Sequence, residues 1–145
     1  MCNYCGCRDF PLIKQLSAEH EEIANAAGRL RTAITKGDGD PLARLDELLA
    51  LLTPHTTAEE TGLFAELRAE GSLSEAVEKL CAEHADIHGV LGRVDRTRPD
   101  WSQVLPALDR LRRHIDNEEH GLFPAAVIAL PISAWDRVTP QQTSA

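Results

Sequence analysis

Aromatic residues are scarce in this 145-residue chain, which has three Phe, two Trp and one Tyr. Strands favour aromatic residues, whereas the Ala and Leu that abound here, with 19 of each, are among the strongest helix formers. Hydrophobic residues make up 43% of the chain, enough for a buried core, and the length suits one domain. The composition therefore predicts an all-α domain.

Two further absences bear on location and partners. No apolar run approaches the ~18 residues of a membrane-spanning helix, and the polar, Cys-rich start is unlike the apolar centre of a secretory signal. The 15 basic residues against 23 acidic ones give a formal charge of −8, which argues against nucleic acid or an anionic membrane as partner and identifies no protein partner. We expect a cytoplasmic protein whose four cysteines are thiols or metal ligands.

Gly and Pro divide the chain into four long segments, each with an apolar stripe at helical spacing. The segments are about 11–36, 41–70, 72–94 and 101–130. Their short connections predict an up-down-up-down four-helix bundle over residues 11–130, with a Cys-rich arm at 1–10 and a tail at 131–145. Pro54 lies inside the second segment and predicts a kink there.

The first half of the chain is repeated in the second half. Leu16–Ile23 matches Leu80–Ile87 at an offset of 64 residues, and His55–Phe64 matches His114–Phe123 at an offset of 59. The bundle is therefore predicted to be a duplicated helical hairpin with a pseudo-two-fold axis.

Histidines and glutamates interrupt the apolar stripe of all four segments. Residues four apart lie on one helix face, and bare burial of such groups would cost several kcal/mol, so they must be hydrogen-bonded, paired or metal-bound. Together these segments offer five imidazoles and two carboxylates. Because each carboxylate can span two metal ions, the set predicts a dinuclear site, which suits iron, with manganese and zinc as weaker candidates. The candidate ligands are His20, His55, Glu59, His84, His88, His114 and Glu118.

Ligand counting makes the two predicted metal positions unequal, because the repeat pairs His88 with Ala24. Both metals share the two glutamates and a bridging oxo or hydroxo group, and a first-row metal commonly takes about six ligands. The metal with three imidazoles is then saturated, and the metal with two keeps a vacancy for O2, NO, peroxide or azide. The saturated metal would be held by His84, His88 and His114, and the open one by His20 and His55.

The pattern His20 … His55-x3-Glu59 … His84-x3-His88 … His114-x3-Glu118 resembles the hemerythrin-like (HHE) cation-binding family over residues 11–130. The resemblance implies a four-helix bundle that holds two non-haem iron ions with an oxo or hydroxo bridge. Oxygen-carrying hemerythrins end with His-x4-Asp, whereas this chain ends with His-x3-Glu, so reversible O2 storage is not carried over. Glu119 is the alternative ligand to Glu118.

Several functions stay open for such a site. The first is binding or sensing of a small ligand (O2, NO or peroxide), the second is peroxide decomposition by a catalase- or peroxidase-like enzyme, and the third is iron or redox sensing. Around the site, Glu19 and Glu83 are candidate acceptors for imidazole N–H groups, and Glu60 is expected to be a solvated charge. The Cys-rich arm, with Cys2, Cys5 and Cys7, could bind metal, form a redox pair or be inert.

Overall fold

The computed structural model describes residues 10–138, and every regular element in this range is helical. The all-α prediction is confirmed for these residues, none of which lies in a strand. Within the same range, no helix combines the length and the apolar character needed to cross a membrane. The cysteines of the N-terminal arm, Cys2, Cys5 and Cys7, lie outside the described residues.

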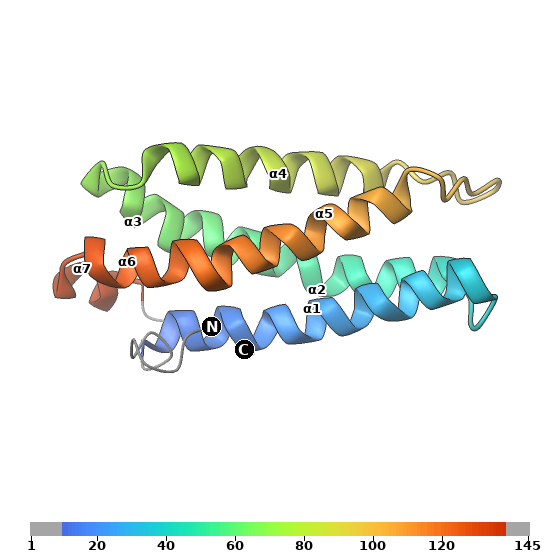
Figure 1. The fold of residues 1–145 in the computed structure, drawn as a ribbon, viewed down its shortest axis with the longest axis horizontal. Helices are drawn as coiled ribbons and strands as arrows, with labels where there is room; N and C mark the ends of the chain where they lie inside the picture. Colours follow the sequence, from blue (N-terminus) through green and yellow to red (C-terminus); the bar gives the residue numbers. More distant parts are fainter. Residues whose placement is uncertain (1–9, 139–145) are drawn as a thin grey trace.

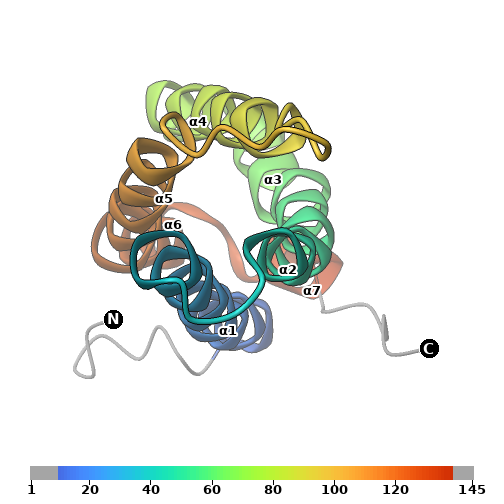
Figure 2. The same ribbon diagram turned by 90° about the vertical axis from the view of Figure 1, so that its right-hand side faces the viewer.

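Four long helices form the body of the molecule. They lie along one axis (Figure 1) and surround a common interior (Figure 2). They are α1 (Pro11–Lys36), α2 (Pro41–Thr61), α4 (Ser74–Gly92) and α5 (Val104–Asn117). The connections from α1 to α2 and from α4 to α5 lie at one end of the molecule (Figure 1).

Within residues 10–138, four shorter helices lie at the opposite end of the molecule (Figure 1). They are α3 (Leu63–Glu70), the π-helix η2 (Glu118–Leu122), α6 (Phe123–Ala129) and α7 (Ile132–Arg137). Helix α2 continues through Pro54, the position of the predicted kink, and ends at Thr61, where Gly62 separates it from α3. A Cβ on Gly62 would lie 2.8 Å from the carbonyl oxygen of Ala58, so the break requires glycine at this position.

Local signals fix the ends of the first two helices. Pro11 and Pro41 each occupy the first turn, where the missing N–H costs nothing. The Asp40 side chain accepts a hydrogen bond from the backbone N–H of Leu42 at 3.1 Å, which caps α2. Gly37 ends α1 in the left-handed region at φ 68°, a conformation that favours glycine.

The core consists of two apolar clusters at different heights along the bundle. The first includes Ile13, Leu16, Phe64 and Phe123, and α7 covers it by packing Trp135 against Phe10 at a ring distance of 4.7 Å. The second lies nearer the loops that join α1 to α2 and α4 to α5. Its fully buried members include Ile23, Leu30, Leu48, Ile87 and Leu91. Polar side chains in the layer between these clusters are shielded from water on both sides.

Candidate metal centre

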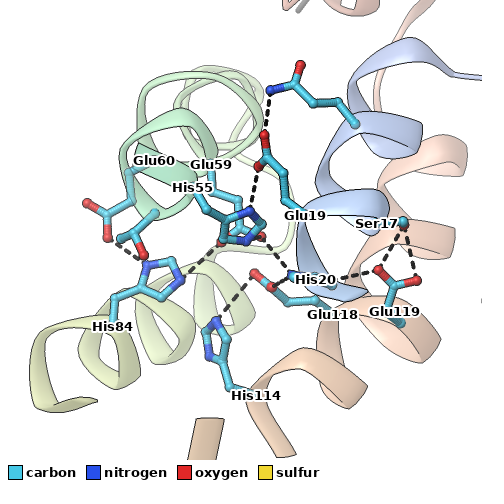
Figure 3. A network of polar contacts seen from close by, with 12 residues as sticks. Ser17, Glu19, His20, His55, Glu59, Glu60, His84, His114, Glu118 and Glu119 are labelled. Atoms are coloured by element: carbon cyan, nitrogen blue, oxygen red, sulfur yellow. Dashed lines mark hydrogen bonds and ion pairs between the residues drawn. The ribbon is translucent and has the colours of Figure 1, made fainter. Parts of the chain in front are cut away.

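Six of the seven predicted ligands converge in this buried layer (Figure 3). The two glutamates, Glu59 and Glu118, are 0% exposed, and the four imidazoles are at most 5% exposed. Donor atoms of these residues form two groups, in each of which all atoms lie within 4.8 Å of one another. Both glutamates belong to both groups; His20 and His55 complete the first, and His84 and His114 complete the second.

The inner distances repeat from one group to the other. Each inner glutamate lies close to one imidazole of each group, so each carboxylate spans the centre. The shorter contacts are His20 Nε2 to Glu118 Oε1 at 3.0 Å and His84 Nε2 to Glu59 Oε1 at 3.0 Å. The longer contacts are His55 Nε2 to Glu59 Oε2 at 3.5 Å and His114 Nε2 to Glu118 Oε2 at 3.5 Å.

Several inner donor atoms are buried without a hydrogen bond. These atoms are both oxygens of Glu59, one oxygen of Glu118, and the Nε2 atoms of His84 and His114. Leaving a buried polar or charged group unsatisfied costs on the order of 1–3 kcal/mol or more, so such atoms ordinarily face a partner. Imidazole nitrogens and carboxylate oxygens around a shared centre are the donors that first-row metal ions take. The residues present therefore fit a pair of cations.

A second ring of carboxylates holds the other nitrogen of each of the four imidazoles in the donor groups. The Nδ1 atoms lie 2.7–2.8 Å from an outer glutamate, which fixes the proton on Nδ1 and directs Nε2 inward. Three of the pairs are His20 with Glu119, His55 with Glu19, and His84 with Glu60 (Figure 3). The fourth pair is His114 with Glu83.

The outer ring is crossed between the helices. Each outer glutamate is next in the chain to one inner residue but accepts a hydrogen bond from an imidazole on another helix. Glu19, for example, is next to His20 and accepts its hydrogen bond from His55. The sequence predicts this role for Glu19 and Glu83, whereas Glu60, which is expected there to be a solvated charge, in fact bonds to His84 through its carboxylate. The signal was present in the repeat, which places a second glutamate after each inner one.

Glu118 and Glu119 occupy different places at the start of the π-helix η2. Glu118 points between the donor groups, whereas Glu119 bonds to His20 Nδ1 and accepts hydrogen bonds from Ser17 Oγ at 2.8 and 3.1 Å. Single π turns often occur at functional sites. The structure therefore places the i+4 carboxylate inside the centre and the i+5 carboxylate outside it.

His88 has a different environment from the other six candidates. It lies one turn after His84 and is half-buried, and its Nε2 is 3.0 Å from Thr56 Oγ1. Neither of the two donor groups found among residues 10–138 includes it. In this arrangement four imidazoles surround the centre, two on each side.

The carboxylates around the centre favour charged imidazoles whenever no cation is bound. Burial lowers the pKa of His55, but the hydrogen bond to Glu19 and the close negative charge of Glu59 outweigh burial and raise that pKa to about 10. Burial likewise lowers the pKa of His114, and the contact with Glu118 overrides it, raising the pKa to about 9. Since metal ions bind the neutral imidazole, uptake of a cation near neutral pH must release protons from these residues.

The outer ring makes a testable contribution to metal affinity. We expect Glu19→Gln to weaken metal binding by about 10–100-fold, because an amide can no longer stabilise the Nδ1 proton of His55 as a carboxylate does. Glu22→Gln, an exposed substitution one turn along the same helix, is the matched control and should leave the affinity unchanged. Competition with a chromophoric chelator measures both constants, and equal affinities for the two variants would contradict the role of Glu19.

Comparison with known proteins agrees with this donor set. A family model described as the hemerythrin HHE cation binding domain matches residues 11–126, a range that contains all seven candidate ligands. No curated protein and no solved structure shows a significant match to the chain.

Proposed function

Because this chain belongs to the hemerythrin HHE cation-binding domain family, we propose that it is a non-haem di-iron protein that binds or senses a small molecule such as O2, NO or peroxide. The observation that carries the proposal is the pair of donor groups that share Glu59 and Glu118. The proposal includes an up-down-up-down bundle in which α1 and α2 form one hairpin and α4 and α5 form its repeat.

Ligand counting supports room for a small molecule. Each group offers two imidazole nitrogens and one oxygen from each of Glu59 and Glu118, which makes four protein ligands. Iron, the metal that the family resemblance implies, commonly takes about six ligands. Two positions per metal are thereby left for a bridging oxo or hydroxo group and for an exchangeable ligand. A bound iron pair would supply reversible redox chemistry, and the protein would supply the fixed imidazoles and the water-poor surroundings.

Metal analysis and optical spectroscopy test this function. The expected result is two iron ions per chain and new charge-transfer bands when the anaerobically reduced protein meets NO, O2 or peroxide. Steady evolution of O2 from peroxide would identify the catalase-like alternative. The proposal would be overturned if the purified protein retained no iron after reconstitution. It would also be overturned if the spectrum of the iron-loaded protein did not change on addition of NO, O2 or peroxide.

A substitution of His88 distinguishes a centre with four imidazole ligands from a centre with five. Because its Nε2 is bonded to Thr56, we expect His88→Ala to keep two metal ions per chain and an unchanged spectrum. His114→Ala is the positive control, since His114 belongs to a donor group, and it should lose metal. Loss of one metal ion in His88→Ala, measured by elemental analysis, would instead make His88 the seventh ligand.

A further inference from the structure

The internal repeat makes the interface between α1 and α5 equivalent to the interface between α2 and α4, yet the two differ. In the α2–α4 interface, half-buried His88 and Thr56 face each other with a 3.0 Å contact between Nε2 and Oγ1. The repeat equivalents in the α1–α5 interface are Ala24 and Ile115, which have no polar side-chain atoms. A polar contact closes one interface, and small or apolar residues occupy the same place in the other.

A groove of about 530 Å³ lies along the α1–α5 interface. Its apolar lining consists of Ala24, Ala27, Gly28, Leu108, Leu111 and Ile115. The lining also includes four charged residues: Arg112 and Asp116 are exposed, and Arg31 and Asp109 form an exposed ion pair between the helices at 2.6 Å. The buried floor of the groove, formed by Leu108 and Leu111, is therefore apolar. An uncharged apolar molecule is favoured there, because moving apolar surface out of water is favourable.

The groove adjoins both donor groups. Ala24 lies one helical turn after His20 on α1, and Ile115 directly follows His114 on α5. His20 belongs to the first donor group and His114 to the second. The end of the groove at Ala24 therefore lies about one helical turn from an imidazole of the buried centre.

Two other grooves are lined by carboxylates of the outer ring, and the α1–α2 groove is lined also by the inner imidazole of His55. The α1–α2 groove, of about 290 Å³, is lined by Glu19 and Glu22, and the α4–α5 groove, of about 650 Å³, is lined by Glu83 and Asp86. These acidic residues occupy equivalent positions in the repeat. In each of these grooves a half-buried carboxylate, Glu19 or Glu83, bonds to an inner imidazole, whereas in the α1–α5 groove Asp109 is exposed and paired with Arg31. Half-buried carboxylates favour water and cations over an apolar gas, so among these three grooves we favour the α1–α5 groove for a neutral diatomic molecule.

We propose that the α1–α5 groove is the entrance through which a small uncharged molecule, of the class of O2 or NO, reaches the metal centre. The inference rests on the function proposed above and adds a route to it. In this proposal a small molecule reaches the metal centre from one side because the α1–α5 and α2–α4 interfaces differ, and not because the two metal ions have different numbers of protein ligands. The His88–Thr56 contact keeps the equivalent α2–α4 side closed.

Gly28 offers a way to fill the groove without disturbing the fold. A Cβ built on Gly28 meets no atom within 4 Å, and leucine is a stronger helix former than glycine, so Gly28→Leu should fold. The matched control is Gly92→Leu, because Gly92 is the repeat equivalent on α4 and its Cβ also meets no atom within 4 Å. Ile115→Ala is the opposite change and widens the groove.

Xenon binding tests the groove independently of iron chemistry. In zinc-loaded or metal-free protein, we expect xenon to shift the methyl NMR signals of Ala24 and Ala27 in wild type and in Gly92→Leu. The shifts should be lost in Gly28→Leu. Wild-type protein without xenon shifts at these methyl groups would overturn the proposal that the groove takes small apolar molecules.

Stopped-flow binding of NO to the reduced iron protein tests the route. Gly28→Leu should slow association by about one to two decades, Gly92→Leu should match wild type, and Ile115→Ala should be faster than wild type. Equal rates in Gly28→Leu and wild type would overturn the route while leaving the proposed function intact. Absence of NO binding in wild type would overturn the proposed function, and the xenon result would still decide whether the groove binds apolar molecules.

Discussion

Chelation of the bound metal is expected to lower the thermal midpoint of unfolding by about 10 °C. A ligand present at about 1,000 times its dissociation constant stabilises the folded state by about 4 kcal/mol, and for a chain of this size each kcal/mol corresponds to about 2–4 °C. The structural reason is that Glu59 and Glu118 are 0% exposed and share one buried layer. Burial and the neighbouring Glu59 charge raise the pKa of Glu118, which shows how unfavourable two carboxylates are there without a cation.

Calorimetry of loaded and chelated protein measures this difference, and the chelator effect must disappear when the donors are removed. We expect the double variant Glu59→Gln/Glu118→Gln to melt at the same temperature with and without chelator, because amides cannot replace the two anionic bridges. Wild-type protein that melts at one temperature in both conditions would show that the buried layer is stable without metal.

Helix positions could be predicted wherever the signals were local. The first segment was placed at residues 11–36 and α1 spans Pro11–Lys36, because Pro11 and Gly37 mark its ends through their own backbone preferences. The break in the second segment was not anticipated, since Gly62 ends α2 through its close approach to Ala58 rather than through a turn motif. The chain tolerates Pro54 within a packed helix.

The C-terminal part illustrates the limit set by tertiary contacts. Residues 131–145 read as a tail, yet α7 forms at Ile132–Arg137 within this range. Its Trp135 packs against Phe10, more than a hundred residues away in sequence, and no periodic pattern in six residues could reveal that contact.

Spacing likewise fixes the face on which a side chain lies but not its partner. The repeat and the i,i+4 pairs were sufficient to single out the six residues that the structure brings together. The same rule placed His88 on the face of His84, where its partner is Thr56 on the neighbouring helix α2. That contact depends on how two helices dock, so spacing alone could not predict it. The two donor groups contain four of the five predicted imidazoles, and the His88→Ala experiment tests the fifth.

Glu59→Gln is expected to abolish binding of both metal ions rather than one. Glu59 contributes to both donor groups, and its two oxygens face His84 and His55 at 3.0 and 3.5 Å. The amide keeps the size of the side chain, removes one negative charge and presents an N–H₂ group to one of the two positions. Elemental analysis should find well below one metal ion per chain, with affinity reduced by more than about 100-fold.

Glu60→Gln is the matched control for this prediction, because it makes the same chemical change one residue later. Glu60 touches the centre only through His84 Nδ1, so its loss should weaken affinity by about 10–100-fold and leave two metal ions bound at saturating concentration. The contrast between adjacent glutamates separates a shared bridge from a support of one imidazole. If Glu59→Gln retained one tightly bound ion, the two donor groups would be independent sites. The hypothesis that they form one shared dinuclear centre would then be wrong.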